Sequence, residues 1–234
     1  ALRVLRDRDR LGPAGIEAVA CWIEVLAGRR RWLPLAWLAV RHLSWLRRHD
    51  RTWGAVGYAL LVLGFYRSCV RWLSDFARRS GARAWMLLNL VSALWTVRGG
   101  RGARAVSEHA LALPNDHARY RHHYWLAFEE ARAGALDAAR EHLAHAGPPP
   151  ERSTELGLVR LVEAFELAAG VDPGASLAER ASAVREALND AAWLATGNVD
   201  LRKPYDVAVD ALFADRGFLA RLWVRLVHLP RYGR

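Results

Sequence analysis

The stretch of this sequence with the most reactive side chains runs from His117 to Trp125. Nine positions there hold three histidines, two arginines and three aromatic residues. His142 and His145 follow at a spacing that places two imidazoles on one face of a helix, where they could act as metal ligands. No H-E-x-x-H pattern accompanies them. We therefore expect ordinary helix packing and surface roles first, a partner-facing surface second, and no metal site.

The sequence holds none of the motifs that identify catalytic centres. It has no phosphate-binding loop after a strand, no G-x-S-x-G pattern and no acid pair in a recognisable motif. The turn at 99–102 is glycine-rich, but it follows a predicted helix and contains no lysine. We expect a protein that is not an enzyme and that uses no cofactor.

The elements that position these residues form a repeat. Gly28, Gly64, Gly100, Gly134 and Gly170 are separated by 36, 36, 34 and 36 residues, and each lies between two stretches with helical patterning. A near-constant period of this length is typical of a solenoid, in which each unit buries its apolar face against its neighbours. Each glycine is expected to end one helix and permit the turn to the next.

Apolar residues recur with the helical period on both sides of each marker glycine. Leading helices are predicted at 14–27, 52–63, 84–98, 118–133 and 154–169, and following helices at 31–49, 66–80, 101–113, 135–146 and 176–196. A last pair is expected at 204–215 and 218–229, around Gly217. No alternating strand pattern occurs, so the fold class is all-α. We expect one domain over 1–234, a solenoid of five to six helical hairpins with a leader (1–13), repeats (14–196) and a capping hairpin (198–234).

Composition suits a chain that folds. Hydrophobic residues make up 53% and charged residues 25%. The longest uncharged run, 52–66, has 15 residues and is too short to cross a bilayer. Cys21 and Cys69 are each expected to be a buried free thiol. Residues 1–10 carry four arginines and two aspartates and do not resemble a signal peptide. We expect a cytoplasmic location, with membrane association as the alternative.

Charge and tryptophan are divided unevenly along the chain. Residues 1–104 hold 19 basic and 6 acidic residues, a net of +13, whereas residues 105–234 hold 15 and 18, a net of −3. Eight of the 11 tryptophans also lie in the basic half. Lys203 is the one lysine in the chain, and such lopsided use of arginine can follow from genomic base composition. The basic total is therefore no argument for a nucleic-acid partner.

The centre of the array resembles the tetratricopeptide repeat. Leu126-Ala127, the run from Arg132 to Ala139 and then Ala146 match the small residues of that family's two helices. Shifted back by 34 residues, the same places are occupied by Ala93, Gly100, Ala105 and Ala112. The resemblance covers residues 84–147 and extends by period to 14–196, a period that other α-solenoids share. It implies a right-handed superhelix whose leading helices line a concave groove for peptides or helices of partner proteins.

The resemblance also implies which residues face that groove. They are Arg98, Arg121, Tyr124, Phe128 and Arg132, with Leu87, Leu90 and Leu94 beside Arg98. Arginine pairs bidentately with carboxylates while aromatic side chains supply buried area, so an acidic peptide or a C-terminal carboxylate fits this groove chemically. In the plain alternative, the leucines and Tyr124 pack between helices. We expect a protein partner, and a scaffold or adaptor function.

The basic, tryptophan-rich half supports an alternative function. Arginine and tryptophan together favour the interface of an anionic membrane. Residues 31–48 form a candidate helix that is apolar on most sides, and such a helix is buried against its neighbours, a membrane or a large partner. The C-terminal stretch 218–234 has the same character. The cationic residues expected on this second surface are Arg31, Arg41, Arg47, Arg48, Arg221 and Arg225.

A nucleic acid is the third class of partner. Arginines interleaved with aromatic residues suit phosphate contact and base stacking. The tryptophans, however, follow core-like helical spacing, the second half is acidic and lysine is nearly absent. We rank a nucleic-acid partner below a protein and a membrane.

Overall fold

The computed structural model describes residues 11–114, 118–217 and 224, and over these residues the chain is helical and contains no strand. Its α-helices are α1 (Pro13–Gly28), α2 (Trp32–Arg48), α3 (Asp50–Val62), α4 (Tyr66–Leu73), α5 (Ala84–Arg98), α6 (Ala103–Ala112), α7 (Arg119–Arg132), α8 (Leu136–Ala146), α9 (Thr154–Ala169), α10 (Leu177–Gly197) and α11 (Val199–Leu212). Short 3₁₀ turns follow at Phe76–Arg78 and Ala214–Arg216. The all-α prediction is confirmed for the described residues.

The turns between paired helices follow the predicted glycines in part. Gly64 and Gly134 have φ angles of 81° and 85°, so each adopts the left-handed conformation that ends its helix. After α1, the left-handed residue is Arg30, with φ 52°, two positions beyond the marker Gly28. The helix α10 begins with a capping box, in which Ser176 and Glu179 satisfy each other's backbone N–H groups.

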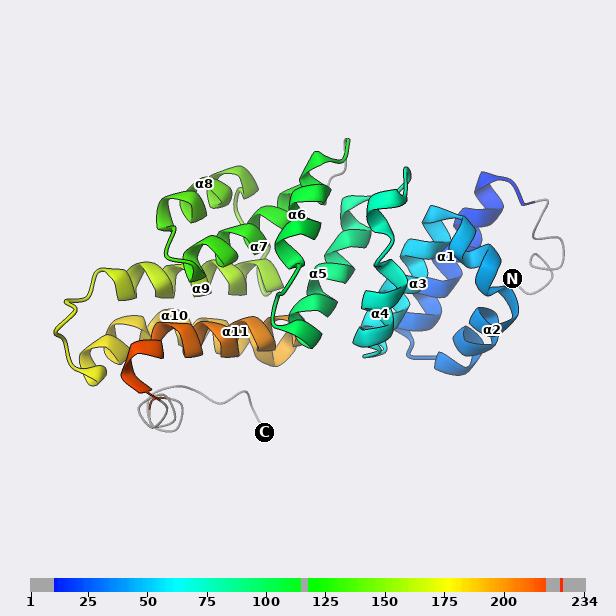
Figure 1. The fold of residues 1–234 in the computed structure, drawn as a ribbon. Coiled ribbons are helices and arrows are strands. Elements are labelled where there is room, and N and C mark those ends of the chain that lie inside the picture. The colour runs from blue at the N-terminus through cyan, green and yellow to red at the C-terminus, as the bar shows by residue number, and fades with distance from the viewer. Residues whose placement is uncertain (1–10, 115–117, 218–223, 225–234) are drawn as a thin grey trace.

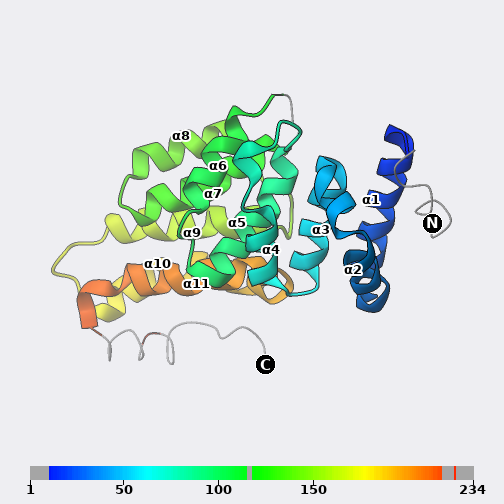
Figure 2. The ribbon, with the colours of Figure 1, turned by 45° about the vertical axis from the view of Figure 1, so that its right-hand side comes forward.

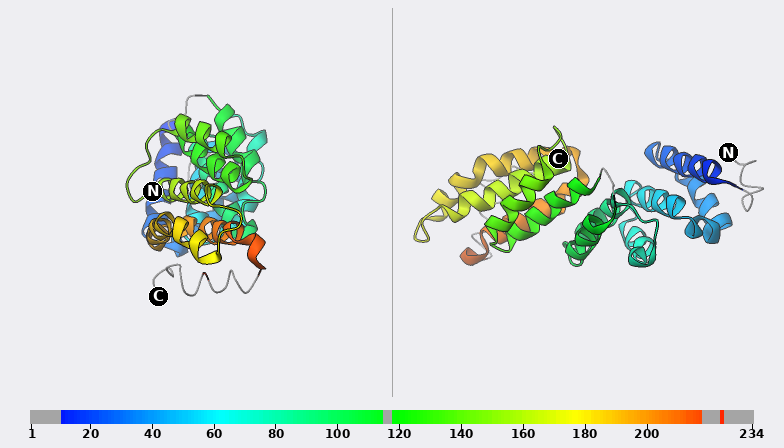
Figure 3. Two further views of the ribbon diagram at one scale, coloured as in Figure 1. Left: turned by 90° about the vertical axis from the view of Figure 1, so that its left-hand side faces the viewer. Right: turned by 90° about the horizontal axis from the view of Figure 1, so that it is seen from above.

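The helices pack mainly against their neighbours in sequence and form an elongated row (Figures 1 and 3). The leading helices α1, α3, α5, α7 and α9 each contact the next one in that order, and the following helices pack beside them. The last described helix, α11, departs from this order because it lies against both α9 and α5 (Figure 1). The chain thus doubles back under its own centre at the C-terminal end of the row.

The predicted final hairpin differs from the structure at its first helix. We placed the start at Pro204, but α11 begins at Val199 and includes that proline. Leu201 is fully buried and lies against Gly157 of α9, so burial of the first turn extends the helix in front of the proline. The predicted partner helix at 218–229 lies outside the described residues except for Val224.

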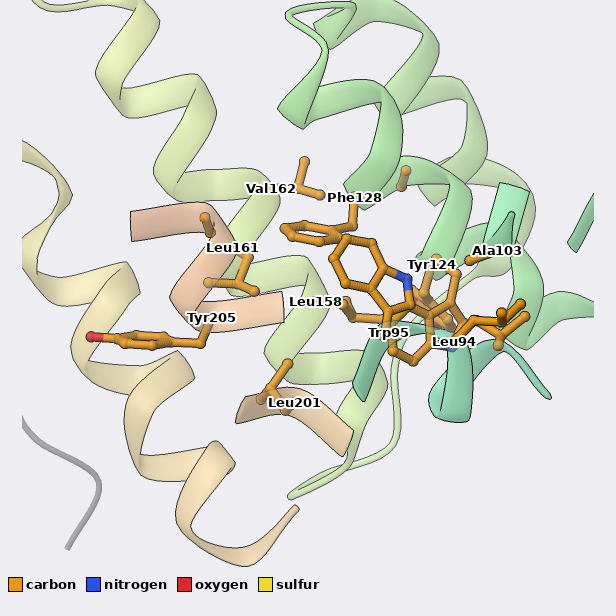
Figure 4. Packing of buried hydrophobic residues seen from close by; sticks show 14 of the residues in the cluster. Leu94, Trp95, Ala103, Tyr124, Phe128, Leu158, Leu161, Val162, Leu201 and Tyr205 are labelled. Carbon is orange, nitrogen blue, oxygen red and sulfur yellow. The ribbon is translucent and has the colours of Figure 1, made fainter. Parts of the chain in front are cut away.

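Two clusters of buried side chains make up the core. The larger one runs from α3 to α11 and includes Trp95, which lies 5.2 Å from Phe128 between ring centroids (Figure 4). The smaller one is formed by α1, α2 and α3, at the N-terminal end of the row (Figure 2). Trp72 of α4 packs against both clusters. The first three helices therefore form a unit with a core of its own, joined to the rest through α3 and α4.

Candidate functional site

Two of the predicted groove residues are core residues. Tyr124 and Phe128 are fully buried, and the Tyr124 hydroxyl donates a hydrogen bond to the carbonyl oxygen of Gly147 at 2.8 Å. The Phe128 ring contacts Trp95 (Figure 4) and, at 6.3 Å between ring centroids, Phe165. The assignment of these two aromatic residues to an open groove is wrong, because α7 packs against α5, α6, α8 and α9 and its aromatic positions fill those interfaces.

Two of the three predicted groove arginines form ion pairs within the chain, and the third is exposed. Arg121 pairs with Glu155 at 2.5 Å, and the Glu155 side chain is almost completely buried. Arg132 pairs with Glu129 at 2.8 Å and lies over the Trp95 ring. Arg98 is exposed at the end of α5. Because Arg121 and Arg132 already satisfy carboxylates of the same chain, they are poorly placed to bind a partner's carboxylate.

The histidines divide between two environments. His122 is buried between the Ser107 hydroxyl, at 3.2 Å, and the carbonyl oxygen of Ala84, at 3.0 Å. His123 lies with its Nδ1 3.0 Å from that of His142, and its ring stacks on His145. Burial is the largest cause that lowers the pKa of His123 and of His142. Neighbouring cationic groups lower the pKa of His123 further, whereas the carboxylates of Glu130 and Glu141 oppose the lowering at His142.

These imidazoles do not form a recognisable metal site. No group of three or more histidine, cysteine or carboxylate side chains in the described part of the chain has the geometry to hold a metal ion. His117 lies outside the described residues. The cluster instead joins α7 to α8 through ring contacts of His123 with His142 and His145.

Helix α2 carries an apolar surface that the other described residues leave exposed. Its inner positions Leu35, Leu38 and Leu46 are buried against α1 and α3. On the outer side Val40 is 87% and Leu33 63% exposed. We call the outer surface the α2 face; it consists of Trp32, Leu33, Trp37, Val40 and Leu43. We left open whether neighbouring helices, a membrane or a large partner covers a helix of this composition. Neighbouring helices cover one side only, because α2 lies at the end of the row (Figures 1 and 2).

The exposure is concentrated at this end of the molecule. Seven of the eleven large hydrophobic side chains that are exposed in the described residues lie between Val25 and Phe65. The end units of helical-repeat proteins normally present a polar outer surface, which keeps them soluble. An apolar outer surface at the end of the array is the kind of patch that marks an interaction site.

Arginines lie close to the residues of the α2 face in the sequence. Arg31, Arg41 and Arg48 are exposed, and the Arg41 guanidinium lies over the Trp37 ring at 5.8 Å. Arg47 is 3.5 Å from Asp75 and lies over Trp72, so it is partly engaged within the chain. Arg221 and Arg225, which we also expected on this surface, lie outside the described residues.

The sequence around the α2 face contains no carboxylate to balance these charges. Residues 25–49 hold six arginines and no aspartate or glutamate. Those arginines are Arg29, Arg30, Arg31, Arg41, Arg47 and Arg48. The combination of apolar and purely cationic side chains is suited to a surface that is itself apolar and anionic.

An apolar pocket of about 300 Å³ lies under the α2 face, between α2 and α3. It has almost no polar surface, and its lining includes two exposed aromatic side chains, Trp32 and Phe65. The pocket therefore opens toward solvent beside these rings. The complete lining is Ile23, Trp32, Leu35, Ala36, Leu38, Ala39, Leu46, Val56, Ala59, Leu60, Leu63 and Phe65.

A wider, polar groove of about 1040 Å³ lies on another side of α1 and α3 and reaches the start of α5. At its centre Arg51 binds Glu17 at 2.8 Å and Glu24 at 2.5 Å, and its guanidinium lies over the Trp85 ring at 5.1 Å. The hydrogen bond from Arg51 lowers the pKa of Glu17. Arg48 and Arg83 lie in the lining of the same groove.

Comparison with known proteins adds no family to this description. None of the family models, curated proteins or solved structures compared with the chain matches it. Within the described residues, no helix combines the length and the hydropathy needed to cross a bilayer. The site must therefore be interpreted from its own chemistry.

Proposed function

We propose that this protein is a non-catalytic docking module that attaches to an anionic membrane surface through its α2 face. The observation that supports this function is the exposed apolar face of a terminal helix, within a segment whose charged residues are all arginines. An interfacial helix needs both properties, since apolar side chains enter the boundary between headgroups and acyl chains while cations meet the headgroups.

The residue types on α2 match the depth in the membrane at which each side chain would lie. Val40 and Leu33 are the most exposed apolar side chains and would enter furthest. Trp32 and Trp37 would lie at headgroup level, which indole rings favour. Each arginine near an anionic surface contributes about 1 kcal/mol, and full burial of a valine or leucine side chain about 1.5–3 kcal/mol. Neither contribution alone secures stable attachment, whereas together they can.

The rest of the molecule extends away from this end. The row of helices leads from α1 and α2 to the α9–α10 hairpin at the opposite end (Figure 1). Attachment by the α2 face would leave the α7–α10 part free to reach other proteins. The scaffold role expected from the helical array is thereby kept, with its anchor at the N-terminal unit.

Vesicle flotation tests the proposal. The protein should float with phosphatidylglycerol vesicles, bind phosphatidylcholine vesicles weakly, and lose binding as salt rises. Leu33→Glu combined with Val40→Glu should weaken binding at least about tenfold, because two apolar contacts are replaced by carboxylates in an anionic interface. Leu167→Glu with Val199→Glu is the matched control, since both side chains are exposed outside the α2 face. Equal binding by the α2 variant and the control would overturn the proposal.

A protein partner is the second candidate, and the polar groove beside α1 and α3 is the observation that favours it. Arg48 and Arg83 could pair with carboxylates of an acidic segment while Trp85 supplies apolar area. A photo-crosslinking residue at position 83 should then capture one protein species in cells, and Arg48→Glu should abolish that capture. A crosslinking pattern that Arg48→Glu leaves unchanged would exclude the groove.

A further inference from the structure

We propose that the apolar pocket between α2 and α3 binds the hydrocarbon chain of an anionic amphiphile, with Arg31 and Arg67 beside its charged head. The inference deepens the proposed function. It rests on that function in one respect, because a membrane can supply this ligand only if the protein docks on the membrane.

The lining selects for a hydrocarbon. All twelve lining residues are apolar, from Ile23 to Phe65, and the pocket walls offer almost no polar surface. A polar ligand group would lose its hydrogen bonds to water and find no replacement, at a cost of a few kcal/mol. The volume of about 300 Å³ is at the lower end of the range for small-molecule pockets. The pocket can therefore hold a slender apolar group and excludes a polar one.

The arrangement of the lining favours an extended chain. On α2 the lining residues run from Trp32 to Ala39, which corresponds to roughly 10 Å along a helix, and Leu46 follows after a kink at His42. On α3 they run from Val56 to Leu60, with Leu63 just beyond the helix end. Side chains from two neighbouring helices thus follow the pocket along their axes. A linear acyl chain can lie along such a slot, whereas one aromatic side chain of a partner protein would occupy only part of it.

The charges at the mouth indicate the ligand's head. Trp32 and Phe65 are the exposed aromatic side chains of the lining. Arg31 directly precedes Trp32 and Arg67 lies two residues after Phe65, and both arginines are exposed. Residues 51–74, like residues 25–49, contain no aspartate or glutamate. An arginine therefore lies within two residues of each exposed ring in the sequence, and we assign a carboxylate or phosphate head to these two cations, to which it is complementary.

Calorimetric titration with dodecanoate, kept below its micelle concentration, tests the pocket. We expect saturable binding with one site per chain. Ala36→Phe should weaken it at least about tenfold, because Ala36 lies in the lining and is itself exposed, so that a phenyl ring there can enter the pocket without displacing the core. Ala18→Phe on the exposed side of α1 is the matched control and should bind as the unaltered protein does. Unchanged affinity in Ala36→Phe, or no saturable binding at all, would overturn the inference.

The head group is tested by comparing dodecanoate with 1-dodecanol. The neutral alcohol should bind several-fold more weakly than dodecanoate. Arg31→Gln combined with Arg67→Gln should remove that difference and leave alcohol binding unchanged. An alcohol that binds the unaltered protein as tightly as dodecanoate does would contradict the role given to the arginines.

Two sources could supply such a chain, a membrane lipid or a free fatty acid. Bromine on an acyl chain quenches nearby tryptophan fluorescence, and Trp32 lies in the lining. The fraction of the quenching that is lost in Trp32→Phe reports on Trp32. If the chain comes from the membrane, vesicles that contain a brominated phosphatidylglycerol should quench this fraction more in the unaltered protein than in Ala36→Phe, because docking brings Trp32 to headgroup level in both proteins but the pocket is open in only one. Brominated fatty acid alone should do so if the chain comes from a free acid, and either result supports the pocket. The absence of this difference with both would contradict it.

The same proteins separate this inference from membrane attachment. Ala36→Phe retains the α2 face, so it should still float with phosphatidylglycerol vesicles. Flotation without dodecanoate binding by the unaltered protein would overturn the pocket and leave the proposed function standing. Dodecanoate binding without flotation would overturn the proposed function and leave the pocket standing.

Discussion

The indole nitrogens of Trp53 and Trp72 each donate a hydrogen bond to the backbone carbonyl oxygen of the other residue, at 3.1 and 2.9 Å. Trp53 lies in α3 and is fully buried, and Trp72 lies in α4. Two guanidinium groups cover the pair, Arg79 over Trp53 at 4.5 Å and Arg47 over Trp72 at 5.8 Å. This reciprocal contact secures the N-terminal unit, with its α2 face, to the rest of the row.

Trp72→Phe should lower the free energy of unfolding by about 1–3 kcal/mol, because the carbonyl oxygen of Trp53 loses its indole donor in a desolvated place. Urea denaturation followed by circular dichroism measures this change. Trp193→Phe is the control, since Trp193 is exposed and its indole N–H has access to water. Equal midpoints for the two variants would show that the reciprocal hydrogen bonds do not stabilise the junction.

The two cysteines should react at very different rates. The expectation that both thiols are buried is wrong for Cys21, which is exposed on α1. Its thiol donates to Glu17 at 3.4 Å, which raises its pKa. Cys69 is buried, and burial raises its pKa to about 12. A disulfide-exchange reagent at pH 8 should therefore modify one thiol per folded chain and two in urea, and Cys21→Ser should abolish the reaction of the folded chain. Modification of two thiols in the folded protein would contradict the buried position of Cys69.

Acid should weaken the contact between α7 and α8. The pKa values of His123 and His142 are lowered in the folded protein, so the unfolded chain binds more protons as the pH falls. Their contribution to stability is therefore full above the unfolded histidine pKa of about 6.5 and is lost as the pH drops through that value and below. Protonation of both rings also leaves two N–H groups facing each other across the 3.0 Å contact.

Urea midpoints at pH 7.5 and 5.5 measure this loss. His123→Gln combined with His142→Gln should show a smaller difference between the two pH values than the unaltered protein does. His109→Gln is the control for a histidine on a different helix, α6. A pH dependence that the double variant retains in full would exclude the pair as its source.

Asp200→Asn should stabilise the protein near neutral pH. Burial is the largest cause that raises the pKa of Asp200, so the charged carboxylate costs free energy in the folded state. The cost is present above the folded pKa and disappears below the unfolded value of about 3.9, where both states are protonated. The asparagine variant should melt at a higher temperature than the unaltered protein at pH 7.5 and at a similar temperature at pH 3.5. A lower melting temperature at pH 7.5 would show that the charge itself stabilises the start of α11.

Local patterns were sufficient to predict most of the helices, because apolar period, glycine turns and proline breaks act within a few residues. The helix α5 was predicted at 84–98 and occupies those positions. The start of α11 could not be predicted in this way, because the burial of Leu201 against Gly157 joins residues far apart in sequence. The contact of α11 with α5 also joins residues far apart in sequence, so it leaves no periodic pattern in the chain.

The surface was predicted less well than the helices. The resemblance placed Tyr124 and Phe128 in a groove, although aromatic residues at helical spacing are also what a core requires, and that is where they lie. The cationic side chains of α2 were recognised, but its composition alone left open whether neighbouring helices, a membrane or a large partner covers its apolar residues. The position of α2 in the first hairpin was the available signal, since a terminal helix has neighbours on one side only.

Fluorescence from a probe on the α2 face would test membrane docking most directly. Val40→Cys in a Cys21→Ser background provides an exposed thiol for nitrobenzoxadiazole, and Val199→Cys in the same background provides a control on α11. With phosphatidylglycerol vesicles, the probe at position 40 should shift to the blue and brighten as it leaves water, while the probe at position 199 should not change. No shift at position 40, or an equal shift at both positions, would contradict attachment through the α2 face.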